Sequence, residues 1–299
     1  MSLFFSGSKD TRVGVDFLRD GVALAQVRIG DGDILRAEYV EARGQQAQVE
    51  ALRQWVRANR LQKTPCVCLV GQDDCDVYQV EKPDVEDDEM IQAVTWKIKD
   101  LINYDVDNAV VDSYPMPESS KNNQQQVGVV AARDTVIGGY VDSIRNSSMQ
   151  LTALDIHELV RSNLATVRQS AGRSLALLSF DRDAGMLSVY HDTDLYVSRG
   201  IVIGLEQLEF AAGDDEGVFD SLQLEIQRSL DYFESYYGIG NVAELQVFPH
   251  VESTEKMVAY LQNQTSLDVD FLALSGPGEA PLDPHCFHAY CAALRGGGE

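Results

Sequence analysis

The segment TRVGVDFLRDGVALAQVR (residues 11–28) contains two apolar runs separated by Arg-Asp-Gly (19–21). An Asp-Gly pair between two such runs is typical of a β-hairpin turn. The next segment, ILRAEYVEAR (34–43), predicts a third strand. Helically spaced apolar residues in QVEALRQWVRANRL (48–61) predict an amphipathic helix, and CVCLVG (66–71) predicts a buried strand. Three strands, a helix and a further strand are the skeleton of an α/β layer.

The second half of the chain repeats this order. Residues 174–201 contain three apolar runs with turns at 182–185 and 192–194, which predict a three-stranded meander. The strongest helical pattern in the chain, 218–238, follows an acidic stretch at 210–220 that we expect to be a linker. Further elements complete this half: a strand and a helix capped by Asp155 at 151–169, a strand at 244–249, a helix at 253–264, a strand at 267–272 and a last helix at 286–294.

Between the two halves lies a stretch that predicts a small α/β insertion. Its helix begins at an acidic run, DVEDDE, where carboxylates suit the positive end of the helix dipole. The polar run SSKNNQQQ (119–126) predicts a mobile hairpin tip. The expected elements are a strand at 76–83, a helix at 86–103, strands at 109–117 and 127–133, and a helix at 135–147.

Two halves, each built from a meander plus an α/β layer, indicate an α/β fold of the duplicated actin-like ATPase type, which is ribonuclease H-like. We therefore expect a first lobe at 1–150, with an insertion subdomain at about 76–150, and a second lobe at 151–299. A chain of 299 residues is long enough for two domains of ordinary size.

Composition excludes several classes of function. The chain has 24 Lys and Arg against 47 Asp and Glu, a formal net charge of −23, whereas nucleic-acid binding needs a basic surface. No apolar run approaches the roughly 18 residues of a membrane span. The start, MSLFFSGSKD, lacks the basic and long apolar regions of a signal peptide, so we expect a cytoplasmic protein.

The five cysteines form no CxxC pair, which favours reduced, buried thiols. Cys66 and Cys68 are two residues apart, so they share one face of a strand and are expected in the core. DPHCFHAYC (283–291) is the one metal-like cluster. His288 and Cys291 could share a helix face, but His285 and Cys286 could not both join them in a tetrahedral zinc site. Buried cysteine is the expectation, with metal binding as the alternative.

Several stretches, in order along nearly the whole chain, resemble the PilM family of type IV pilus assembly proteins. They also resemble, within it, the MshI members of mannose-sensitive haemagglutinin (MSHA) pilus systems. The stretches are VGVDF (13–17), VEDDEMIQAVTWKIKDLINYDVDNAVVDSY (85–114), QLTALDIHELVRSNLA (150–165), LQLEIQRSLDYFESYYG (222–238) and YCAALRGG (290–297). The cytoplasmic domain of the type II secretion protein GspL is a more distant resemblance.

This resemblance implies a protein beneath the pilus machine that binds the cytoplasmic tail of a PilN-like inner-membrane partner. In the family, the tail lies in a groove between the first subdomain and its insertion, and ATP occupies a central cleft. The family's first phosphate loop, D-I-G-S-S-S-x-K, falls on 16–23, where Asp16 is kept. Leu18 replaces the glycine and Ala23 the lysine.

The other two nucleotide elements also depart from the family pattern. The second phosphate loop, D-I-G-A, falls on 179–182, with Ser179 for the aspartate and Asp181 for the glycine. A carboxylate near a triphosphate repels it. The adenosine-side Gly-Gly turn is replaced by Pro249 and His250, which lack the backbone freedom of glycine. We therefore expect a pseudo-ATPase without a cofactor, in which Asp16 is a polar strand-end residue.

No catalytic motif such as GxSxG, GxxxxGK[ST] or HExxH occurs. We treat His157 and His191 as surface or packing histidines. The leading hypothesis is a non-catalytic assembly protein, with Trp96 and Tyr104 as exposed aromatic residues that bind the partner tail. The alternative for Trp96 is packing between subdomains. The alternative functions are an active actin-like ATPase that drives pilus assembly and a GspL-like secretion module.

Overall fold

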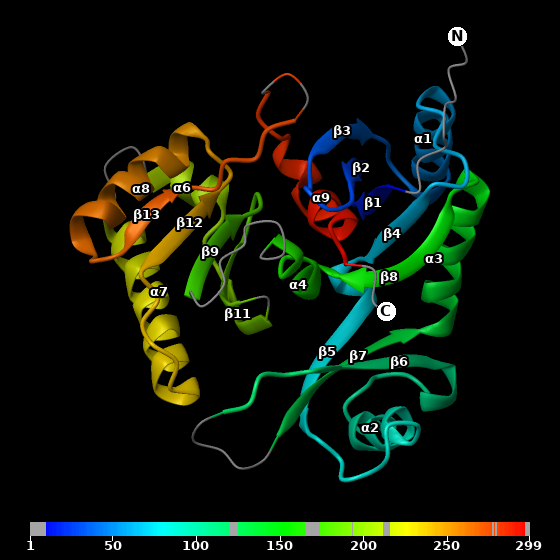
Figure 1. Cartoon of the computed structure of the whole chain (residues 1–299), viewed down its shortest axis with the longest axis horizontal. Coiled ribbons are helices and arrows are strands. Elements are labelled where there is room, and N and C mark those ends of the chain that lie inside the picture. Colours follow the sequence, from blue (N-terminus) through cyan, green and yellow to red (C-terminus); the bar gives the residue numbers. More distant parts are fainter. Residues whose placement is uncertain are drawn as a thin grey trace. The chain divides into compact units, whose positions relative to one another are not determined.

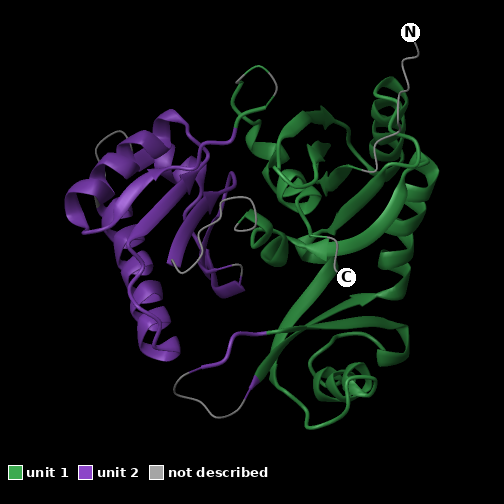
Figure 2. Cartoon of the chain, in the orientation of Figure 1, with its two compact units in different colours: residues 1–115, 126–167, 275–299 green, residues 116–125, 168–274 purple. Residues whose placement is uncertain are grey.

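The computed structural model describes residues 10–119, 125–164, 174–192, 194–211, 216–276, 278 and 280–296. The chain divides into two compact units, 1–115 with 126–167 and 275–299, and 116–125 with 168–274 (Figure 2). The sequence-based lobe boundary at 150/151 differs from this division. Residues 151–167 and the C-terminal segment belong to unit 1 because the strand Gln150–Ile156 (β8) pairs with the strand Pro65–Val70 (β4). The last helix packs on the first two strands of the chain.

The main sheet of unit 1 has five strands in the order β3-β2-β1-β4-β8. The first three strands are antiparallel, and β1, β4 and β8 run parallel. The bounds are β1 Thr11–Leu18, β2 Gly21–Arg28, β3 Ile34–Glu41, β4 Pro65–Val70 and β8 Gln150–Ile156. The predicted hairpin, third strand and buried strand are confirmed.

Helices cover both faces of this sheet (Figure 1). Helices α1 (Gln45–Ala58) and α3 (Asp134–Ser147) cover one face, where Val13 and Val15 of β1 enter the core. Gly14 and Asp16 alternate with these valines and so face the opposite side. On that side lies α9 (Phe287–Ala293), and a Cβ atom at Gly14 would overlap the backbone carbonyl of Ala289. Glycine therefore permits the close approach of α9 to β1.

The insertion in unit 1 is a three-stranded antiparallel sheet, β5-β7-β6, with α2 on one face. Its elements are β5 Cys75–Glu81, α2 Met90–Ile98, β6 Ala109–Pro115 and β7 Gln126–Arg133. Buried Val94 and Ile98 of α2 pack against Val127 and Val129 of β7. Helix α2 is shorter than the expected 86–103, because the acidic run precedes it as turns. The proposed mobile loop falls largely on 120–124, outside the described residues.

Unit 2 repeats the topology of the first sheet, with the order β11-β10-β9-β12-β13 and the same strand directions. This duplication confirms the predicted repeat. The strands are β9 Ser174–Phe180, β10 Gly185–His191, β11 Asp194–Ile201, β12 Glu244–Phe248 and β13 Asp268–Phe271. The helices are α6 Leu205–Ala211, α7 Glu216–Tyr237 and α8 Glu252–Gln264.

Two local predictions are wrong. The expected acidic linker at 210–220 contributes its first residues to α6 and its last to α7, whose buried Phe219 and Leu222 belong to the unit 2 core. Asp155 does not cap a helix. It is the last residue but one of β8, and its side chain accepts hydrogen bonds from Arg295 and from the backbone N–H of Ile156. The helix that follows, α4, spans His157–Val160.

Candidate functional site

The first expected phosphate loop is a two-residue turn. Leu18 pairs with Gly21 across the hairpin, so only Arg19 and Asp20 lie in the turn. The side chain of Gln48 on α1 donates hydrogen bonds to the carbonyl oxygens of Leu18 (2.5 Å) and Gly21 (3.1 Å). The carbonyl of Asp20 accepts from the N–H of Ala42. The turn is thus tied to its own unit on both sides.

The ring of Tyr39 lies over Gly21 in this turn. A Cβ atom at Gly21 would overlap the ring, and the Tyr39 hydroxyl donates to Asp20 Oδ1 at 2.8 Å. Burial and the Asp20 hydrogen bond raise the pKa of Tyr39 to about 12, so the phenol stays neutral. The Tyr39 ring also stacks on the ring of His285, with centroids 4.1 Å apart. Side chains therefore cover the turn.

The second expected phosphate loop begins in β9 and ends in the β9–β10 turn. Ser179 is buried within β9, and Asp181 opens the turn, where its N–H donates to Ala184 O at 2.8 Å. The first N–H groups of α6 donate to the carbonyls of Asp181 and Arg182. Gly204 packs so tightly against this turn that a Cβ atom would overlap the backbone of Asp183 and Ala184. The turn is closed by α6.

The third expected element, at Pro249 and His250, joins β12 to α8. The hydroxyl of Thr254 donates to the Pro249 carbonyl at 2.8 Å and accepts from the Val251 N–H at 3.0 Å. His250 stacks on Phe271, with ring centroids 3.9 Å apart, and its Nε2 lies 3.0 Å from Glu255 Oε1. Side chains from its own unit thus engage both sides of this turn.

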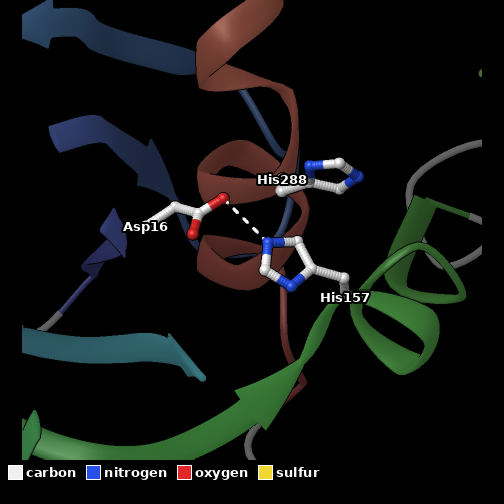
Figure 3. Close-up of side chains that lie close together, drawn as sticks. All are labelled: Asp16, His157 and His288. Atoms are coloured by element: carbon white, nitrogen blue, oxygen red, sulfur yellow. Dashed lines mark hydrogen bonds and ion pairs between the residues drawn. The ribbon is translucent and has the colours of Figure 1, made fainter. Parts of the chain in front are cut away.

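A buried polar cluster lies on the face of β1 that α9 covers. Asp16 Oδ2 lies 3.0 Å from His157 Nε2, and the rings of His157 and His288 meet edge to face with centroids 4.7 Å apart (Figure 3). Arg161, just after α4, places its Nη2 atom 3.0 Å from His288 Nε2. All four residues are at most 7% exposed.

The charges of this cluster follow from its contacts. Burial and the charge of Arg161 oppose protonation of His157, but the negative charge and hydrogen bond of Asp16 outweigh them and raise its pKa. Burial, assisted by Arg161, holds the pKa of His288 well below its usual value. His288 is therefore a neutral acceptor for the Arg161 guanidinium, which can only donate.

This cluster does not fit a metal ion, although donor atoms of Asp16, His157 and His288 lie within 4.8 Å of one another. Arg161 donates to Nε2 of His288, so the proton of the neutral ring is on Nδ1 and neither nitrogen offers a lone pair. Asp16 and His157 would be left as two ligands near a guanidinium, whereas a stable site needs more donors and no adjacent cation.

Trp96 is the most exposed aromatic residue of the insertion. It lies on the outer side of α2 with 65% of its surface accessible, and the Lys99 ammonium is 4.9 Å from its ring. Packing of Trp96 between subdomains is therefore wrong. Tyr104 is half-buried against the insertion core, under the guanidinium of Arg133 at 4.4 Å, so the expectation that Tyr104 is exposed is wrong. The two rings have different cationic partners, Lys99 and Arg133, in the described part of unit 1.

The histidines and cysteines of DPHCFHAYC (283–291) lie in different surroundings. His285 is exposed and stacks on Tyr39, whereas His288 is buried and contacts Arg161. Cys286 and Cys291 are fully buried, as are Cys66 and Cys68, which confirms the prediction of core cysteines. Burial raises the pKa of Cys66 and Cys286 to about 12, so these thiols are neutral and unreactive.

One pocket of about 480 Å³ lies between α1 and α3, on the first subdomain. Its lining includes Gln45, Glu50 and Arg53 of α1 with Gly139 and Asp142 of α3. Neither Trp96 nor Tyr104 lines it.

The buried cluster is the feature that the sequence analysis missed, since His157 was interpreted without a partner and Asp16 as a polar strand end. One signal could have located the Asp16–His157 pair. Strands β1, β4 and β8 run parallel, so Asp16 and His157 lie at the same carboxyl edge of the sheet. No comparable signal in the sequence indicates that Arg161 and His288 join this pair.

Comparison of the sequence with protein-family models finds no match, and comparison with curated proteins finds none either. Solved structures share the fold. The PilM–PilN type IV pilus biogenesis complex contains a chain with TM-score 0.66 and 15% identity, and the match covers 95% of this chain and 97% of that one. The cytoplasmic domain of EpsL, an inner-membrane component of the Vibrio cholerae type II secretion system, matches with TM-score 0.51 and 12% identity over 96% of each chain.

A third structure is a Bacteroides thetaiotaomicron protein with an actin-like ATPase fold and unknown function. It matches with TM-score 0.50 and 11% identity, over 91% of this chain and 94% of that one. All three identities are too low to carry more than the fold. The described helices include none long and apolar enough to cross a membrane. The duplicated sheets and these matches together establish that the chain has the actin-like fold.

Proposed function

We propose that this chain is a non-catalytic assembly protein of a bacterial type IV pilus of the MSHA kind. In this proposal it works in the cytoplasm and is held at the inner membrane by a PilN-like partner whose cytoplasmic tail it docks. The observation that carries the proposal is the likeness to the chain solved as part of the PilM–PilN complex, which extends over almost the full length of both chains.

Three turns support the absence of catalysis. Each occupies a position where the family resemblance expects nucleotide contacts, and each is held by side chains or helix ends of its own unit. Phosphate binding in such folds needs backbone N–H groups that a phosphate can approach closely. Tyr39 covers the first turn and α6 closes the second, so nucleotide binding would require both to move.

Two surfaces of the insertion are candidates for docking. The first is the outer side of α2 around Trp96, with Tyr104 beyond the helix end. The second is the face of the insertion sheet opposite α2, where Val77 and Val110 are each more than 40% exposed. The family resemblance implies a groove between the first subdomain and its insertion. The second surface would form the insertion side of that groove. Asp112 lies on the same sheet face, so a basic tail would suit it.

The test uses the full chain and a synthetic peptide of the cytoplasmic tail of the inner-membrane protein encoded beside it. Fluorescence anisotropy measures tail affinity for the unmodified chain, Trp96→Ala and Val110→Asp. Phe210→Ala is the matched control, because Phe210 is a comparably exposed aromatic residue of unit 2. We expect micromolar binding that one insertion variant weakens and the control does not. Absence of tail binding by the unmodified chain would contradict the proposal.

The likeness to EpsL supports a second candidate, a cytoplasmic module of a type II secretion system. Affinity purification of inner-membrane proteins with the full chain discriminates between the two. Recovery of a pilus component supports the pilus function, and recovery of secretion components supports the second candidate. The third candidate is an active ATPase. Titration with Mg-ATP tests it: saturable binding would support an ATPase, and absence of binding would exclude it.

A further inference from the structure

Arg161 and His288 come from the two segments that flank the excursion of the chain into unit 2. Arg161 follows α4, shortly before the chain leaves unit 1 after residue 167, and His288 lies in α9, shortly after the chain returns at Ser275. A second contact joins the same segments, because the Asn163 side chain donates to the Cys291 carbonyl at 3.0 Å. Both segments are thus fastened to one another inside unit 1.

The fastening also reaches the central strand. His157 of α4 pairs with Asp16 of β1, and its ring meets that of His288. Gly14, two residues before Asp16, lets α9 lie directly on β1. We propose that Arg161 and His288, supported by the Asp16–His157 pair, form a proton-sensitive clasp that holds α4 and α9 together on β1.

The clasp works only while His288 is neutral. Its Nε2 lone pair accepts the Arg161 N–H, and a proton on that nitrogen would place two donors and two positive charges against each other. The groups that face His288 are Arg161 and His157 from the α4 segment and Asp16 from β1. On α9 itself, burial keeps the Cys291 thiol neutral by raising its pKa.

The neighbouring groups favour the neutral ring. Two further Arg161 nitrogens, Nε and Nη1, are buried without a hydrogen-bond partner among the described residues. His288 therefore supplies the side-chain acceptor that this guanidinium has in the described structure. Release of the clasp exposes both histidines to solvent, where an imidazole has a pKa near ~6.5. Acid therefore favours the released state through His288, whereas Asp16 raises the pKa of His157 in the closed state and so opposes this effect.

The test is hydrogen–deuterium exchange of the full chain between pH 7.5 and 5, corrected for the intrinsic exchange rates. The backbone amides of 287–293 report on α9. A solvated His288 imidazole alone would raise their opening equilibrium about thirtyfold by pH 5. His157, whose pKa is raised in the closed state, offsets part of that rise, so we expect a rise of between about threefold and thirtyfold. His288→Gln keeps an acceptor for Arg161 but cannot be protonated, so its rise should stay below about threefold.

His285→Gln is the matched control, because it removes an exposed imidazole two residues before α9. It should keep the rise of the unmodified chain. The same rise in His288→Gln, or no rise in the unmodified chain, would overturn the proposal. If His288→Gln does not fold, an NMR titration of the unmodified chain decides instead. His288 should remain neutral to pH 5, and titration near its ordinary pKa would contradict the clasp.

Discussion

The ring of Tyr39 lies directly over Gly21, so the tip of the first hairpin is closed by a side chain from the neighbouring strand. The same tyrosine donates to Asp20 and stacks on His285, so three separate segments meet at the turn. The turn that would face a phosphate is instead part of the packed surface of unit 1. This relationship predicts how the hairpin responds to substitution.

Gly21→Ala should destabilise the chain by about 1–3 kcal/mol, because the added methyl group overlaps the Tyr39 ring. The measurement is urea unfolding followed by circular dichroism. Combining it with Tyr39→Ala should make the effect of the glycine substitution much smaller, since the overlapping ring is gone. Equal effects of Gly21→Ala in the presence and absence of Tyr39 would refute the arrangement.

Gly14→Ala should be more damaging, about 3 kcal/mol or more, because its Cβ atom meets the Ala289 backbone rather than a side chain that can move. Limited proteolysis should then cut near α9 earlier than in the unmodified chain. Gly139→Ala is the control, since Gly139 lies in α3 with only the end of Gln45 nearby. It should be neutral or slightly stabilising. A Gly14→Ala protein as stable as the control would contradict the packing of α9.

Arg295→Met should destabilise the chain by about 1–3 kcal/mol at pH 7, because it leaves the buried Asp155 carboxylate without its cation. Burial raises the pKa of Asp155, against the opposing charge of Arg295. Without Arg295, the pKa of Asp155 in the folded state rises further above its value in the unfolded state. The penalty should therefore shrink as pH falls from 7 toward 4.

The control for this pH series is Arg145→Met, whose partner Asp142 is exposed. Loss of that pair should change the free energy of unfolding by less than about 0.5 kcal/mol at either pH. A penalty for Arg295→Met that is constant from pH 7 to pH 4 would show that Asp155 does not take up the proton.

Trp96→Ala should leave the free energy of unfolding within about 0.5 kcal/mol, because the indole is mostly exposed. If Trp96 anchors the partner tail, affinity for the tail peptide should fall by about tenfold or more. Unchanged tail affinity in a folded Trp96→Ala protein would remove Trp96 from the docking site and favour the sheet face around Val77 and Val110.

The fold was accessible from the sequence because period-2 and helical patterns recur in the same order in both halves. The hairpin at 11–28 and the meander at 174–201 are confirmed with bounds within a few residues. The helix expected at 218–238 is confirmed as α7, whereas the linker expected at 210–220 is too long, because α6 extends to Ala211 and α7 begins at Glu216.

The buried cluster could be predicted only in part. The strand order brings Asp16 and His157 to one sheet edge, and that follows from the parallel pairing of β1, β4 and β8. Arg161 and His288 join them because the chain returns to unit 1 after its excursion into unit 2, and no local pattern encodes that return. For the same reason the sequence divided the lobes at 150/151, without the C-terminal helix in the first unit.

The central claim is that an actin-like fold is used here without nucleotide. Isothermal titration calorimetry of the full chain with Mg-ATP, and separately with Mg-ADP, tests it most directly. The account predicts no heat beyond dilution at protein concentrations that would detect micromolar binding. Saturable binding of either nucleotide with micromolar affinity would contradict it.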